Sequence, residues 1–210
     1  MKTIPRATFA LLVGIGFGLG GCASPNIVLQ PTFPVVPSSS APETLGTVSL
    51  AVSGTERNPQ GSRYEEKGDK TLIGNSESLG VHLSDFWVQE PPHMFVKRLL
   101  DDDLRAWGFK VSADNEKNQL HGRVNAFSLK SRAISAIEFQ ADGVIDVDLE
   151  VSRADGTQPY KGHYVGTCTH RTATEIPNKE NMEKLFNRCV EELQKHLQED
   201  GNLRTALSSN

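Results

Sequence analysis

Residues 143–152 read Gly-Val-Ile-Asp-Val-Asp-Leu-Glu-Val-Ser, and their alternation is the clearest indication of the fold class. From Ile145 to Val151 every second residue is apolar and those between are acidic, which is the period of a strand with one buried and one wet face. Asp155-Gly156 follows with the chemistry of a hairpin turn, and a return strand is predicted from about Pro159 to Arg171. The pattern therefore predicts an antiparallel sheet that needs apolar cover on one face.

Two helices are predicted to supply that cover. The first follows Pro91-Pro92, carries apolar residues at spacings of three and four as far as Trp107, and stops at Gly108. The second runs from about Lys179 to Gln198 with an apolar face of the same kind, and the tail beyond Gly201 looks polar.

The remaining extended segments complete the layer that the helices cover. Strands are predicted over 46–52 and 120–129, a loop over 54–70, and two short strands within 71–88. We therefore predict an α+β fold, a two-layer sandwich of a mainly antiparallel sheet packed by two amphipathic helices, in one domain covering residues 46–210.

The amino terminus has the layout of an export signal. Two basic residues open the chain, and the mostly apolar residues 7–19 that follow are too few to span a bilayer, which takes about 20. Leu19-Gly20-Gly21-Cys22 then resembles the bacterial lipobox. By that resemblance residues 1–21 are a lipoprotein signal peptide and Cys22 is acylated, which anchors the protein permanently. The alternative is a secreted protein with an incidental cysteine.

Residues 22–45 are predicted to be the acylated cysteine and a Pro/Ser-rich tether. This segment holds five of the 11 prolines of the chain, and about 20 residues of extended proline-rich chain reach roughly 60 Å. The alternative is that an apolar part, between Ile27 and Val36, packs on the domain. Ala23 follows Cys22 in place of the Asp that retains many enterobacterial lipoproteins in the inner membrane. This favours an outer-membrane location with the domain facing the periplasm.

Charge and cysteine content exclude several classes. The net charge is -4, and removal of residues 1–21 leaves 20 basic against 26 acidic side chains, so nucleic acid is not expected as a partner. Three cysteines in 210 residues cannot replace a hydrophobic core. No phosphate-binding glycine loop and no Gly-x-Ser-x-Gly motif lies in the mature chain, so we expect no catalytic residues and no cofactor.

Several segments in order resemble the YajG-type family of outer-membrane lipoproteins. They are the lipobox and proline-rich stretch, the strand at 46–52, the segment 104–111, the segments 145–151 and 160–164, and residues 177–182 before the last helix. The resemblance implies a periplasm-facing lipoprotein without known enzymatic activity or cofactor, and the one functional residue it carries over is Cys22.

Cys168 and Cys189 are predicted to form a disulfide. With Cys22 given to the lipid, two thiols remain for the oxidising periplasm. Cys189 lies on the apolar face of the last helix, and Cys168 shares a strand face with Tyr160 and Tyr164, so the two thiols could approach. The alternative is two separate buried thiols.

The acidic stripe Asp142, Asp146, Asp148 and Glu150 is the candidate partner surface. Its members share one strand face, so their charges must be solvated or must meet cations. One interpretation is a wet outer sheet face, and the other is a docking surface for a basic partner.

Two further clusters are interpreted as structural. His163, Cys168 and His170 do not point to one side of their strand, so no metal site is predicted. The run 101–103 of three Asp residues diverges around a helix and pairs with neighbouring arginines at its surface.

The expected function is that of a non-enzymatic, lipid-anchored envelope lipoprotein. It would bind the membrane through its acyl chains and present a periplasmic binding domain to another envelope component, a protein or a glycolipid. The alternative is a lipid or glycolipid carrier or transport accessory, which needs a deep apolar groove between helix and sheet. A hydrolase of envelope polymers would need a polar cleft with paired carboxylates.

Overall fold

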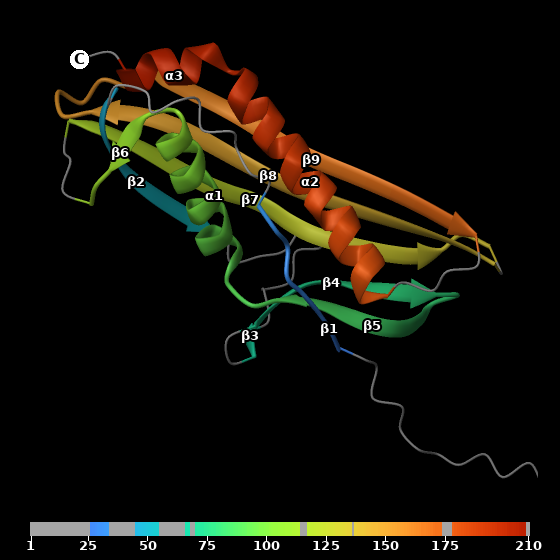
Figure 1. The fold of residues 1–210 in the computed structure, drawn as a ribbon. Coiled ribbons are helices and arrows are strands. Elements are labelled where there is room, and N and C mark those ends of the chain that lie inside the picture. The colour runs from blue at the N-terminus through green and yellow to red at the C-terminus, as the bar shows by residue number, and fades with distance from the viewer. Residues whose placement is uncertain are drawn as a thin grey trace, which may run out of the picture.

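The structure of the protein, a computed structural model, describes residues 26–33, 45–54, 66–67, 70–113, 117–135, 137–173 and 178–208. Among these residues one mixed sheet forms a layer, and the helices pack on one face of it (Figure 1). The strands are β1 (Asn26–Leu29), β2 (Gly46–Gly54), β3 (Glu66–Lys67), β4 (Lys70–Ser78), β5 (Val81–Val88), β6 (Phe109–Val111), β7 (Asn118–Ala133), β8 (Glu138–Arg153) and β9 (Tyr160–Ala173). The helices are α1 (Pro92–Ala106), α2 (Lys179–Glu199) and α3 (Gly201–Ser208).

The long strand β7 organises the sheet. One edge of β7 pairs along its length with β8, and β8 pairs in turn with β9, all antiparallel. The other edge is shared by two parallel neighbours, β2 on its first half and β4 on its second half. Because the longest pairings are antiparallel, the predicted α+β sandwich with a mainly antiparallel sheet is confirmed, and the parallel strands add to it.

The core lies between the sheet and the helices. The apolar residues of β8 predicted to face inward are buried, and the stripes of α1 and α2 cover them. Phe95 of α1, Phe127 of β7 and Phe186 of α2 stack edge to face, with ring centroids 5.4 and 5.0 Å apart. This chain of rings joins both helices to the central strand.

The end of the chain differs from the prediction of a polar tail. Helix α3 follows Asp200, whose carboxylate accepts hydrogen bonds from the backbone N–H groups of Asn202 and Leu203. Its residues Leu203, Ala206 and Leu207 are buried. Apolar residues at spacings of three and one are enough to hold a short helix on the core when a cap starts it.

The amino-terminal segment also differs from the predicted tether. Strand β1 pairs in parallel with β5, and Leu29 is fully buried. Phe33 then stacks on Phe95 with ring centroids 4.8 Å apart. Residues 26–33 thus pack on the domain, as the apolar alternative predicts, and the domain begins before residue 46. Cys22, the signal peptide at 1–21 and the tether residues 34–44 lie outside the described residues.

Candidate functional site

The outer face of β7, β8 and β9, which none of the described helices covers, carries the predicted acidic stripe. Its members lie at alternate positions of β8, from Asp142 to Glu150, and are partly exposed. They lie between basic side chains of the neighbouring strands, in register with Lys130, Arg123 and His121 on β7 and with His163 and Lys161 on β9. The stripe is therefore one row of a mixed-charge face.

Close contacts fix the middle of this row. Arg123 donates to Asp148 at 2.7 Å, and Asn125 donates to Asp146 at 2.9 Å. The imidazole Nδ1 of His163 lies 2.8 Å from an oxygen of Asp148 and 3.5 Å from one of Asp146. Hydrogen bonds from Asn125 and Arg123 lower the pKa of Asp148 well below its usual range, so Asp148 stays ionised at neutral pH. The acids are predicted from the sequence and these partners are not, although residues 119–125 alternate polar and apolar side chains in the same way.

Asp146, Asp148 and His163 form the group among the described residues that could hold a metal ion, with ligand atoms within 4.8 Å of one another. Both of its carboxylates already accept hydrogen bonds, Asp148 from Arg123 and Asp146 from Asn125. The positive charge of the Arg123 guanidinium would repel a cation bound beside it. The other grouping considered from the sequence, His163 with Cys168 and His170, does not come together, because Cys168 is bonded to another cysteine.

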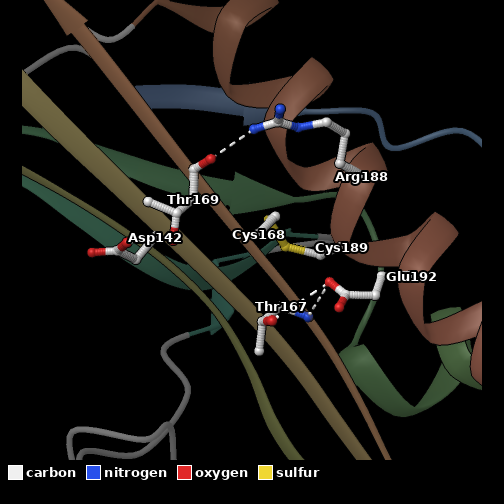
Figure 2. The surroundings of a disulfide bond; sticks show 7 residues. All are labelled: Asp142, Thr167, Cys168, Thr169, Arg188, Cys189 and Glu192. Atoms are coloured by element: carbon white, nitrogen blue, oxygen red, sulfur yellow. Dashed lines mark hydrogen bonds between the residues drawn. A yellow bond between two sulfur atoms is a disulfide. The ribbon is translucent and has the colours of Figure 1, made fainter.

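A disulfide joins Cys168 of β9 to Cys189 of α2, with the two Cα atoms 5.0 Å apart (Figure 2). This is the pairing predicted from the sequence. Glycines make the close approach possible, because a Cβ added to Gly143 would lie 2.6 Å from the sulfur of Cys189 and one added to Gly166 would lie 2.2 Å from its carbonyl oxygen. The helix backbone therefore lies almost directly on the strand.

Helix α2 also covers the free edge of β9. Arg188 donates to the carbonyl oxygen of Thr169 at 2.8 Å, and Glu192 accepts from the N–H of Thr167 at 3.0 Å, on either side of the disulfide (Figure 2). One turn further, His196 donates to the carbonyl oxygen of Val165 at 3.0 Å. These three side chains, spaced by four residues, occupy backbone groups that an added strand would use.

Asp103 corrects the prediction of three surface carboxylates at 101–103. Asp101 does pair with Arg105, at 2.7 Å, on the surface of α1. Asp103 is fully buried instead, where it accepts a hydrogen bond from Gln194 of α2 at 2.7 Å, and its second oxygen has no partner among the described residues. Burial raises the pKa of Asp103 to about 6, and the hydrogen bond from Gln194 offsets part of that rise.

A second polar cluster ties α3 to the sheet. The hydroxyls of Tyr160 and Tyr164 both donate to Asp200, at 2.5 and 2.8 Å. Burial and the bond to Asp200 raise the pKa of Tyr160 to about 12, so it stays protonated. Because Asp200 is also the cap of α3, this cluster acts as structural support.

Two hollows lie on the surface of the described residues. One of about 230 Å³ lies where β2 ends beside β7, and polar or charged side chains such as His121, Arg123 and Lys161 line it. The other, of about 220 Å³, lies between β9 and α2 beside His170 and Arg188. Neither is a deep apolar groove.

Comparisons place the chain among lipoproteins. A family model described as "Uncharacterized lipoprotein" matches residues 36–208. No curated protein matches the chain in sequence. In the part of the chain that the structure describes, no helix is long and apolar enough to cross a membrane.

Solved structures resemble the fold at low sequence identity. A Xanthomonas campestris protein of the DUF330 family is 12% identical with a TM-score of 0.50, and the match covers 85% of this chain and 96% of that one. The rare lipoprotein B of Shewanella oneidensis is 13% identical with a TM-score of 0.37, over 65% of this chain and 99% of that one. At such identities the first likeness concerns the fold alone.

Proposed function

The chain belongs to this family of uncharacterized bacterial lipoproteins, and from that premise we propose that it is a non-enzymatic lipoprotein of the outer membrane whose periplasmic domain binds another envelope component. In this proposal Cys22 carries the acyl chains. The proposal also assigns the chain, within the lipoproteins, to the YajG-type family. The proposal rests on one observation above all: the outer face of β7, β8 and β9 is covered by none of the described helices and carries side chains of both charges in register across the strands (Figure 1).

The described face favours a folded protein as the partner. Asp146 and Asp148 are held by ion pairs and hydrogen bonds, so they present oriented charges instead of mobile ones. Lys161 and Glu150 lie opposite each other in register, and within the part of the chain that the structure describes neither forms an ion pair. A partner of complementary mixed charge could therefore pair with both signs without first breaking strong contacts.

The close contact between α2 and the sheet argues against a lipid-binding groove between these two elements, which the alternative of a lipid carrier would need. Phe127, Phe186 and the disulfide fill the space, and a single added Cβ at Gly166 would collide with the helix backbone. An acyl chain has no room between these described elements. The hydrolase alternative finds little support on the outer face, because Asp148 is held ionised by its partners and is a poor proton donor.

Crosslinking in cells tests the partner surface. A photo-crosslinking residue at Lys161 should capture a defined envelope protein, whereas one at Lys195 on the solvent side of α2 is the matched control. Asp146→Asn with Asp148→Asn should lower the yield at position 161 at least severalfold. Equal yields from both positions, or a yield that the double variant leaves unchanged, would argue against this surface.

Labelling tests the anchor separately. Cells fed radioactive palmitate should label the wild-type protein and leave Cys22→Ser unlabelled, and the variant should move from the membrane fraction to the soluble periplasm. Labelling of the variant, or a membrane fraction that does not change, would contradict acylation of Cys22.

A further inference from the structure

Two neighbouring turns at one end of the sheet carry exposed apolar side chains. In the β4–β5 turn Leu79 is 89% exposed and Val81 is 61% exposed, and in the β7–β8 turn Ile134 is 41% exposed and Ile137 is 66% exposed. Glu77 of β4 pairs in parallel with Arg132 of β7, so the turns that follow both strands lie side by side (Figure 1). Together they form one apolar tip, which we call the turn tip.

The backbone conformation at Leu79 disfavours a leucine, so the stability of the fold does not account for an apolar side chain at this position. Leu79 has a φ of 51° and Gly80 a φ of 78°, so both central residues of this two-residue turn are left-handed. Asn, Asp or Gly is preferred at such positions, and a leucine there is disfavoured. A residue that costs the turn stability and is almost fully exposed points to a contact outside the domain.

The position of the proposed anchor supplies the second observation. Strand β1 runs parallel to β5, and Asn26 lies opposite Asp85, four residues from Val81 at the tip. Four residues of strand span about 13 Å. Four Cα steps separate Cys22 from Asn26, and they reach at most about 14 Å. Because β1 pairs with β5, the chain from Asn26 back to Cys22 can reach the turn tip. A free tether over residues 22–45 would not hold Cys22 near the tip.

We propose that the turn tip is a membrane-docking surface, which inserts its four apolar side chains into the phospholipid interface beside the acyl anchor. The occupant is the lipid surface itself, and the proposal rests on the proposed acylation of Cys22 for its geometry. Lys130 and Arg132 are exposed just behind the tip, and Glu77 and Glu138 lie there too. Because the charges are mixed, the apolar side chains carry the binding.

The first experiment removes the anchor and tests the surface alone. The mature chain with Cys22→Ser is sedimented with vesicles of phosphatidylethanolamine and phosphatidylglycerol at 3:1. It should bind weakly, and Leu79→Ser with Ile137→Ser should lower the partition coefficient about tenfold or more. Met94→Ser is the matched control, because Met94 is also exposed but lies at the start of α1, beyond the other end of β5. An equal loss in the control, or no loss in the double variant, would overturn the proposal.

The second experiment uses the anchored protein and does not depend on weak binding. Trp87 and Trp107 are buried, so an added tryptophan reports on its own surroundings. In vesicles of the same composition containing brominated lipid, fluorescence from Ile137→Trp should be quenched, and that from Met94→Trp should not. If palmitate labelling fails but the unanchored chain still binds through the tip, only the proposed anchor is wrong. If labelling succeeds and Ile137→Trp is not quenched, the docking surface is wrong.

Discussion

Replacement of the buried Asp103 by Asn should change how stability depends on pH. Asp103 lies between α1 and α2 with one oxygen bonded to Gln194 and the other without a partner among the described residues. Asn has nearly the same volume and can still accept from Gln194, but it cannot ionise. The substitution therefore removes the cost of a buried charge and leaves the packing of the two helices in place.

The size of the effect follows from the pKa of Asp103, which is about 6 in the folded protein and 3.8 as its ordinary value. Because the folded value is the higher one, the stabilisation from this group is complete below pH 3.8 and is lost as the pH rises through 6. Full ionisation costs about 3 kcal/mol. Between pH 4.5 and 7.5 the wild type should lose about 2 kcal/mol that Asp103→Asn does not lose.

Urea denaturation of both proteins, oxidised and in the Cys22→Ser background, measures this difference through the fluorescence of the buried tryptophans. Groups such as Asp148, whose pKa is lowered and whose contribution is lost as the pH falls, are present in both proteins and cancel. The free energy of unfolding of Asp103→Asn relative to wild type should rise by about 2 kcal/mol from pH 4.5 to 7.5. A difference that stays the same at the two pH values would refute the argument that Asp103 is a buried acid of raised pKa.

Three further perturbations test the contacts around the helices. Reduction of the bond between Cys168 and Cys189 should lower the free energy of unfolding by about 3 kcal/mol, and alkylation of both thiols without reductant would show that the bond is absent. Gly166→Ala should cost about 3 kcal/mol or more in urea denaturation, because its Cβ would lie 2.2 Å from a carbonyl oxygen of α2, whereas Gly201→Ala, with nothing within 4 Å, should be nearly neutral. Phe33→Ala should cost about 1–2 kcal/mol and speed amide exchange in β1; unchanged exchange would contradict its docking.

Local patterns were enough to predict the parts of the fold in which burial alternates along the chain. Strand β8 and helix α2 have long, regular apolar periods, so their existence and their buried faces follow from the sequence. Helix α3 is short, and its apolar residues gain from burial only because Asp200 starts the helix over a sheet that is already in place. The eight residues of α3 carry no information about the sheet on which they pack, so the helix could not be predicted from them alone.

Pairing between distant segments is what the sequence could not show. Strand β4 buries Thr71 and Ser76 as well as Ile73, so its composition does not mark it as a strand between two neighbours. Strand β1 pairs with a partner more than fifty residues away, and nothing in its four residues specifies β5. For the same reason the acids of the outer face were visible from the sequence but the cations opposite them were not, because register across strands fixes those pairs.

The covered surfaces narrow where a partner can bind. Helices occupy one face of the sheet, and Arg188, Glu192 and His196 close the edge of β9 to an added strand. If the turn tip meets the lipid, β8 rises away from the membrane and its outer face looks sideways into the periplasm. Asp142 then lies nearest the lipid and Glu150 about 26 Å further out along the strand. A membrane-embedded partner should therefore crosslink most strongly at the Asp142 end and a soluble one at the Glu150 end, whereas capture independent of position would argue that β8 does not stand in this way.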